Sequence, residues 1–196
     1  QKYVSKYLDG FIFPSKENQL DVNIDITVVG NSPKLIKQED LKLKPFKERD
    51  QAICYIGGLS YSRGITHLIK AAYEANCRLI LVGSFENASY QNECQNMVEY
   101  SIVDYRGVLP HEEALQLLSE PRIGMATLLN VGQYKNLTNF ATKITEYCMY
   151  GLPVIMNETE YHKKMLEKYN FGFCVNPENI KQITNLIVSI IDNPNY

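Results

Sequence analysis

The sequence contains no tryptophan, no pair of cysteines at metal-site spacing and no long run of apolar residues. A membrane-spanning helix needs about 20 consecutive apolar residues, so we expect no transmembrane segment. The 20 basic and 22 acidic residues nearly balance, and no block or helix face collects the basic ones. Nucleic acid is therefore not expected as a partner, because proteins that bind it carry a clustered basic patch.

The start of the chain, QKYVSK, has neither the apolar core of a signal peptide nor an initiator methionine. We therefore expect a trimmed chain from a cytoplasmic protein. The 5 cysteines are an odd number and include no CxxC pair, which argues against a zinc site. Free thiols are typical of proteins in the reducing cytoplasm, so the cysteines also favour a cytoplasmic location.

From residue 51 onward, short apolar runs alternate with stretches of helical periodicity. The runs that read as strands are 52–56, 78–82, 102–106, 123–127, 153–156 and 171–175. The expected helices are 65–72, 86–99, 110–119, 141–150, 160–169 and 180–191. Continuous apolar runs are typical of strands buried on both faces of a parallel sheet. The sequence therefore predicts an α/β fold with a doubly wound parallel sheet of the Rossmann-like kind.

The beginning of the chain has a different pattern. Short apolar runs at 10–14 and 24–29 read as strands, and residues 34–50 are rich in Lys, Glu and Asp. We therefore divide the chain into three parts. Residues 1–33 precede a linker or surface arm at 34–50, and residues 51–196 form one Rossmann-like domain.

One stretch that could carry chemistry is 142–155, where a polar loop leads into a helix that begins with Lys143 and Glu146. Free amides at a helix start attract phosphate, and a lysine there adds a full charge. A carboxylate one turn further can accept hydrogen bonds from vicinal sugar hydroxyls. The same spacing is also that of an i,i+3 ion pair on a helix surface, so the spacing alone leaves both interpretations open.

A second stretch, 55–65, reads YIGGLSYSRGI and follows the first strand of the domain. Gly57 and Gly58 would let the backbone approach a phosphate closely. Arg63 could clamp a diphosphate with two parallel hydrogen bonds. The glycine spacing fits neither the dinucleotide fingerprint nor the P-loop, so this stretch is a weak signal by itself.

Several segments match one family pattern in register. TKITEYCMYGLPVI at 142–155 looks like N-K-L-F-E-Y-M-A-x-G-L-P-V-I, and 55–65 looks like Y-V-G-x-L-x-x-x-K-G-I. YRGVLP at 105–110 fits F-x-G-x-V-P, and TVVGNSP at 27–33 is similar to the interdomain link V-x-V-I-P-N-G. The chain thus resembles glycosyltransferase family 4, the former group 1, whose bacterial-type members have the GT-B fold of two facing Rossmann-like domains. The resemblance implies the C-terminal, nucleotide-sugar-binding half, with residues 1–33 as the end of the N-terminal domain and the interdomain link.

The resemblance also implies residue roles. Arg63 and Lys143 would hold the donor diphosphate as catalytic contacts, since a leaving diphosphate needs charge stabilisation. Glu146, the third residue of the catalytic set, would bind the ribose hydroxyls. The implied donor-binding residues are Gly57, Gly58, Gly83, Arg106, Gly107, Val108, Thr138, Thr142 and Ile144. Of these, Thr142 and Ile144 would offer amides to phosphate, and 106–108 would lie along the base.

Two positions depart from the family pattern. Thr138 stands where the family has the first Glu of its Glu–seven residues–Glu motif, near the donor sugar. Gly58 stands where the family has a second phosphate-binding basic residue. We therefore expect altered sugar contacts or turnover, and one diphosphate contact that is missing or supplied elsewhere. We interpret the absent Glu as a subgroup trait.

The resemblance implies a retaining hexosyltransferase that uses a nucleotide-diphosphate sugar and neither cofactor nor metal, and no Asp-x-Asp motif is present. The acceptor would be a glycan or a lipid-linked molecule held by the missing N-terminal domain. Surface polysaccharide assembly, with peripheral association of the full protein at the inner membrane face, would be the setting. Two alternatives stay open at this point: a non-catalytic nucleotide-binding relic, and a sugar-nucleotide epimerase of the same architecture.

Overall fold

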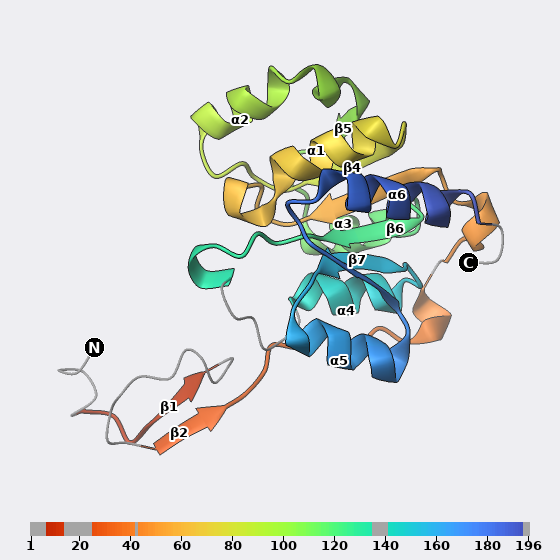
Figure 1. The fold of residues 1–196 in the computed structure, drawn as a ribbon. Coiled ribbons are helices and arrows are strands. Elements are labelled where there is room, and N and C mark those ends of the chain that lie inside the picture. The colour runs from red at the N-terminus through yellow and green to blue at the C-terminus, as the bar shows by residue number, and fades with distance from the viewer. Residues whose placement is uncertain (1–6, 14–24, 42, 135–140, 194–196) are drawn as a thin grey trace.

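The structure is a computed structural model that describes residues 7–13, 25–41, 43–134 and 141–193. Among these residues, the larger sheet has 6 parallel strands in the order β5-β4-β3-β6-β7-β8 (Figure 1). The strands are β3 (Ala52–Ile56), β4 (Arg78–Val82), β5 (Val103–Tyr105), β6 (Ile123–Ala126), β7 (Val154–Asn157) and β8 (Gly172–Val175). The order reverses between β3 and β6, which is the doubly wound arrangement. The predicted fold class is confirmed.

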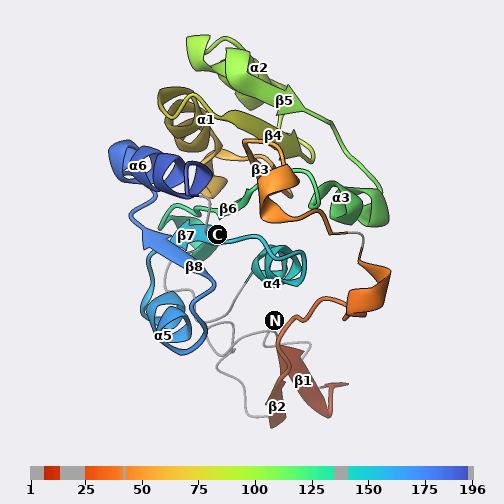
Figure 2. The same ribbon diagram turned by 90° about the vertical axis from the view of Figure 1, so that its right-hand side faces the viewer.

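Helices cover both faces of this sheet. The α-helices of the described residues are α1 (Ile65–Glu74), α2 (Ala88–Gln95), α3 (His111–Leu117), α4 (Thr142–Met149), α5 (Glu160–Tyr169) and α6 (Ile180–Ile191). Figure 2 shows α1 and α6 on one side of the sheet and α3 and α4 on the other. No helix in the described ranges is long and apolar enough to cross a membrane.

Strand β3 shows why the strands read as continuous apolar runs. Ile53 and Tyr55 belong to the core under α1 and α6, whereas Ala52 and Cys54 belong to the core under α3 and α4. All four side chains are fully buried. A strand covered on both faces leaves no position for a polar side chain, so the period-2 alternation of a half-exposed strand disappears.

Most predicted elements agree with the structure to within two residues at each end, but one predicted helix differs more. The helix expected at 86–99 is the shorter α2 followed by a 3-10 helix, η6 (Val98–Ile102). The side chain of Asn87 caps α2 by accepting a hydrogen bond from the Tyr90 amide at 2.8 Å. Extended backbone at Met97 separates the two helices, so the expected helix is interrupted and the next strand begins later.

The arm at residues 34–50 is fixed to the domain at its end. It contains two 3-10 turns, η3 (Gln38–Asp40) and η4 (Phe46–Glu48). Arg49 is 6 % exposed and donates hydrogen bonds to the Tyr150 carbonyl at 2.8 Å and to the Lys44 carbonyl at 2.9 Å. A buried guanidinium with carbonyl partners locks this part of the arm to the end of α4.

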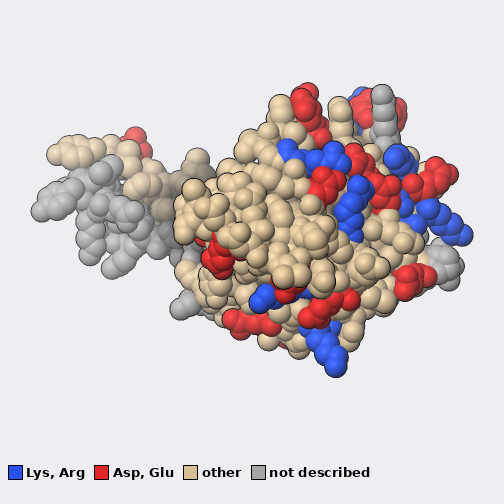
Figure 3. Space-filling model, turned by 90° about the horizontal axis from the view of Figure 1, so that it is seen from above, with Lys and Arg blue, Asp and Glu red and all other residues tan. Residues whose placement is uncertain are grey.

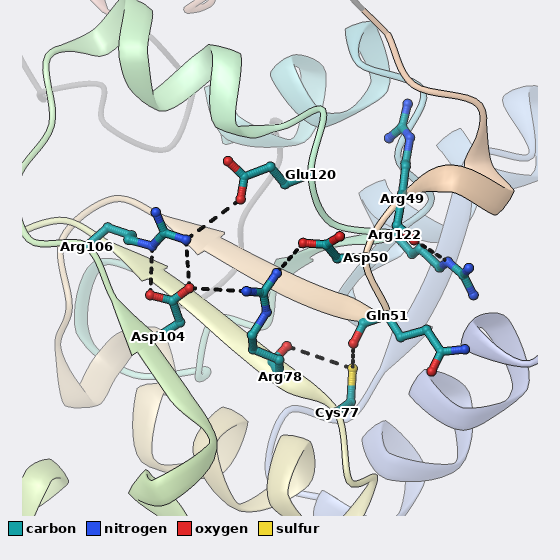
Figure 4. Close-up of polar contacts among 9 residues, drawn as sticks. All are labelled: Arg49, Asp50, Gln51, Cys77, Arg78, Asp104, Arg106, Glu120 and Arg122. Carbon is teal, nitrogen blue, oxygen red and sulfur yellow. Dashed lines mark hydrogen bonds and ion pairs between the residues drawn. The ribbon is translucent and has the colours of Figure 1, made fainter.

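Charged side chains alternate in sign on the sheet near Asp50, which precedes β3 (Figure 4). Arg78 pairs with Asp50 and, at 3.5 Å, with Asp104. Arg106 binds Asp104 at 2.7 Å and lies 3.8 Å from Glu120. These partly exposed pairs contribute little stability each, but they fix where Arg106 points. Seen from above in Figure 3, most of the visible charges lie on the side away from β1 and β2.

A second, 2-stranded sheet lies apart from the domain (Figure 1). Its strands, β1 (Gly10–Phe13) and β2 (Asp25–Val28), pair in parallel. Ile12 is 74 % exposed and Val29, just beyond β2, is 54 % exposed. Two strands cannot bury a core between them. The division of the chain at residues 33 and 50 stays a prediction.

Gly83 is expected to tolerate alanine much less well than Gly107, although both have positive φ angles of 137° and 68°. A Cβ at Gly83 would lie 1.9 Å from the Gly57 carbonyl oxygen, whereas one at Gly107 would meet nothing within 4 Å. We expect Gly83→Ala to lower the free energy of unfolding by about 3 kcal/mol or more. Gly107→Ala should cost about 1–2 kcal/mol from strain alone. Urea unfolding of both variants measures this, and equal losses would contradict the contact.

Candidate functional site

The turns after β3, β4 and β5 meet at the carboxyl edge of the sheet. The Gly57 amide donates to the Val82 carbonyl at 2.9 Å, and the Gly83 amide donates to the Gly107 carbonyl at 2.7 Å. Gly83 packs so closely against the Gly57 backbone that there is no room for a side chain at position 83. Three predicted glycines thus come together in one layer of exposed backbone, where ligands of doubly wound sheets bind.

Helix α4 begins beside this edge because it packs closely on the sheet. A Cβ at Gly124 would lie 2.4 Å from the Tyr147 ring, so only glycine lets α4 approach β6 this far. The Tyr147 hydroxyl accepts a hydrogen bond from the Ile56 amide at 3.0 Å. These two contacts hold the first turn of α4 next to the end of β3, at the point where the strand order reverses.

Lys143 is a buried lysine, 8 % exposed. Its Nζ lies 3.5 Å from the centre of the Tyr55 ring and has no hydrogen-bond partner among the described residues. A Cβ at Gly57 would stand 3.0 Å from this nitrogen, so the absence of a side chain at Gly57 lets the buried ammonium group lie close against the turn. A buried ammonium group without a hydrogen-bond partner is energetically costly. Such a group is suited to binding an anion.

Arg63 approaches the same glycine from the 3-10 turn η5 (Tyr61–Arg63). Its Nη1 donates to the Tyr55 hydroxyl at 3.4 Å and would lie 3.6 Å from a Cβ at Gly57. The guanidinium also lies 5.6 Å from the centre of the Tyr134 ring. We name Gly57, Arg63 and Lys143 the two-cation site, because both positive groups face one glycine turn.

The electrostatics of the two-cation site favour an anion. Burial lowers the pKa of Lys143 well below its usual range, and the charge of Arg63 lowers it further. Cys54 and Glu146 act in the opposite direction on this pKa. Burial also raises the pKa of Tyr55 to about 12, so this phenol stays neutral. An anion between the two cations would relieve their repulsion and raise the pKa of Lys143 back toward its usual range.

The start of α4 offers free amides, at positions that differ by one from the prediction. The Ile144 amide donates to the Ala141 carbonyl at 2.9 Å, so it is already engaged. The amides of Thr142 and Lys143 have no acceptor among the described residues, and Ala141 provides no side-chain cap. Within the described ranges, the donors left without an acceptor at this helix start are therefore those of Thr142 and Lys143.

Glu146 lies deeper along α4 and is 8 % exposed. Its Oε1 is 3.5 Å from Nε2 of His111 at the start of α3. Lys143 and Glu146 are both buried and form no ion pair with each other in the described structure, so the interpretation of a surface ion pair is wrong. Both Glu146 and His111 line a cavity of about 620 Å³ between α3, α4 and residues 33–40 of the arm.

The segment 106–108, which is expected to lie along the base, is partly exposed, but the side chain of its arginine is already engaged by acidic residues. The Arg106 side chain points toward Asp104 and Glu120 (Figure 4), not into the two-cation site. Gly107 has open space where a side chain would be, and Val108 is 71 % exposed. This segment can offer backbone and the Val108 side chain to a ligand. Thr138 lies outside the described residues.

The sequence singled out neither Tyr55 nor His111 as a site residue. Tyr55 reads as a core residue of a buried strand, and no pattern of spacing reveals that its ring lies under Lys143. Within the described ranges, no group of three or more His, Cys, Asp or Glu side chains is placed to hold a metal ion.

The fold and the site together define a doubly wound domain whose carboxyl edge attracts anions. Residues 36–196 match the family model described as "Glycosyl transferases group 1". The chain therefore belongs to the group 1 glycosyltransferase family. Comparison with curated proteins gives no match.

Solved glycosyltransferase structures share the fold at low sequence identity. HepE from Anabaena, solved in complex with UDP and glucose, is similar with a TM-score of 0.71 and 17 % identity, over 97 % of this chain and 55 % of that one. TarM from S. aureus gives 0.66 and 16 %, over 97 % and 38 %. AviGT4 of avilamycin A biosynthesis gives 0.65 and 16 %, over 91 % and 54 %. The chain thus spans about half or less of the length of these structures.

Replacing Lys143 with methionine is expected to stabilise the free chain by about 1–3 kcal/mol at pH 7, because it removes an unpaired buried charge. Folding lowers the pKa of this lysine below 10.5, so above the folded pKa the unfolded chain holds more protons. The stability of the native chain therefore rises with pH in that window, and the advantage of Lys143→Met shrinks toward pH 10.

Urea unfolding at pH 7 and pH 9 measures this difference. The exposed Lys70 of α1 is the matched control, and we expect Lys70→Met to change the stability by the same small amount at both pH values. A Lys143→Met variant that is less stable than the native chain at pH 7, or whose advantage grows with pH, would contradict the burial of a costly charge.

Proposed function

We propose that this chain binds the nucleotide-diphosphate part of a sugar donor at the two-cation site and forms the donor half of a retaining glycosyltransferase. The observation that supports this most is the buried ammonium group of Lys143 near Gly57, for which the described part of the chain offers no hydrogen-bond partner. Arg63 lies beside the same glycine, and the amides of Thr142 and Lys143, which have no acceptor among the described residues, stand at the start of the helix that carries the lysine. A diphosphate offers oxygen acceptors for these donors.

In this proposal, Glu146 accepts hydrogen bonds from the ribose hydroxyls. Its carboxylate is buried beside His111 and lines the cavity of about 620 Å³ beside the second half of α4. A nucleoside attached to the diphosphate would then extend from the two-cation site toward α3. The exposed backbone at Gly107 and Val108 would lie along the base.

The proposed chemistry needs positive charge rather than a protein nucleophile. As the bond from the sugar to the diphosphate breaks, negative charge grows on the leaving phosphate. Arg63 and Lys143 stabilise that charge from fixed positions, so we propose transfer without a metal ion or cofactor. Retention of anomeric configuration follows from the family resemblance.

We also propose that a further domain completes the enzyme. β1 and β2 form a small parallel sheet with exposed apolar side chains, as expected for the edge of a sheet that continues elsewhere. The similar HepE structure is nearly twice as long, since the chain covers 55 % of it. That domain would hold a glycan or lipid-linked acceptor, in the cytoplasm at the inner membrane face.

A non-catalytic relic is the alternative that two residues favour. Gly58 and Thr138 replace two polar residues of the family pattern. The two proposals predict the same diphosphate binding but differ in transfer, so an assay of the chain joined to its N-terminal domain separates them.

Calorimetric titration of the chain with UDP, GDP and UMP tests the proposed function. We expect one diphosphate to bind with micromolar to millimolar affinity and its monophosphate to bind more weakly, because the two-cation site holds the second phosphate. Glu146→Ala should weaken the diphosphate about 10-fold or more, the value of a hydrogen bond to a charged group.

Glu160 of α5, whose side chain is 85 % exposed, provides the control for Glu146. We expect Glu160→Ala to bind the diphosphate as the native chain does. Absence of binding of all three nucleotides to the folded chain, or equal losses in both variants, would overturn the proposed function.

A further inference from the structure

One side chain, that of Tyr55, contacts both cations of the two-cation site and the residue that follows its glycine. Its ring lies under Nζ of Lys143 at 3.5 Å, and its hydroxyl accepts a hydrogen bond from Arg63 at 3.4 Å. The same hydroxyl donates to the Gly58 carbonyl at 3.2 Å. Tyr55 is fully buried, so it cannot touch a ligand itself.

The ring of Tyr55 is placed to hold the ammonium group of Lys143 without neutralising it. A carboxylate in that position would pair with the lysine and compete with any anionic ligand. The face of an aromatic ring attracts a cation through its quadrupole and adds no net charge. The ring of Tyr55 therefore supports the ammonium group of Lys143 on one side, and the Gly57 turn lies close to it on another.

The hydroxyl of Tyr55 is placed to orient Arg63 and the glycine turn together. A phenol can donate one hydrogen bond and accept another. Here the hydroxyl donates its hydrogen bond to the Gly58 carbonyl, so the lone pairs of its oxygen can accept the hydrogen bond from Nη1 of Arg63. Because burial raises the pKa of Tyr55 to about 12, this arrangement persists through the neutral pH range.

We propose that Tyr55 is the positioning residue of the diphosphate site: its hydroxyl sets the guanidinium of Arg63 against the Gly57-Gly58 turn, and its ring sets the ammonium group of Lys143. The proposal rests on the proposed function, since it names what orients the two cations that hold the diphosphate. Tyr55 acts only through these two side chains.

A double-mutant cycle between Tyr55→Phe and Arg63→Gln tests the hydroxyl. Phenylalanine keeps the buried ring and removes only the oxygen. We expect Tyr55→Phe to weaken diphosphate binding about fivefold in the native chain, the value of one ordinary hydrogen bond. In the Arg63→Gln background the same change should have a clearly smaller effect, because the guanidinium that the hydroxyl positions is gone and only the hydrogen bond to the Gly58 carbonyl is lost.

A second cycle tests whether the effect is specific. Combined with Lys143→Met, the loss from Tyr55→Phe should simply add, since the ring under the lysine remains. Tyr105 is the matched control, because its hydroxyl donates to the Gly83 carbonyl at 3.0 Å in the same way but contacts neither cation. Tyr105→Phe should show no coupling to Arg63→Gln. Additive losses for Tyr55→Phe and Arg63→Gln would overturn the proposal.

A measurement without ligand separates this inference from the proposed function. In the native chain, the Nε–H signal of Arg63 should show restricted motion by ¹⁵N relaxation. In Tyr55→Phe it should become as mobile as an exposed arginine, whereas Tyr105→Phe should leave it unchanged. An Arg63 signal that is equally ordered in Tyr55→Phe would overturn the positioning role, whatever the titrations show. Failure of the native chain to bind any diphosphate would count against the proposed function alone.

Discussion

The unpaired, buried ammonium group of Lys143 is the feature to which the rest of the site is adapted. A cation taken out of water normally acquires a carboxylate or several acceptors, but this one has no hydrogen-bond partner among the described residues and lies between the face of Tyr55 and the Gly57 turn. The arrangement is unfavourable in the free chain and becomes favourable when an anion enters. Stability is given up where a ligand binds, as is common at functional sites.

This arrangement depends on close packing elsewhere in the domain. α4 can bring Lys143 to the end of β3 only because Gly124 lets the Tyr147 ring lie against β6. The Gly57 backbone can take its position only because Gly83, just after β4, has no side chain that would clash with the Gly57 carbonyl. Each glycine thus has a specific steric reason, and the geometry of the two-cation site is a consequence of sheet packing more than of the loops that line it.

The sequence predicted the sheet well because strands buried on both faces leave a strong pattern. The run at 52–56 became β3 with the same bounds, and 78–82 became β4. The expected helix at 86–99 was too long, because the cap at Asn87 and the extended Met97 are local events that periodicity does not reveal. The position of Lys143 was predictable from a helix start, but its burial was not. That burial arises from contact with Tyr55, a residue distant in sequence that reads as ordinary core.

In the proposed function, the two cations differ in what they can contribute. Arg63 is only partly buried and always charged, so its planar fork suits capture of an incoming diphosphate. Lys143 lies deeper, where water screens less and a charge interacts more strongly with one that grows nearby. Charge on the leaving phosphate is greatest as the sugar departs. The deeper cation, Lys143, is therefore expected to stabilise the departing phosphate more strongly than the donor that first binds. This gives a physical reason for a buried lysine at that position.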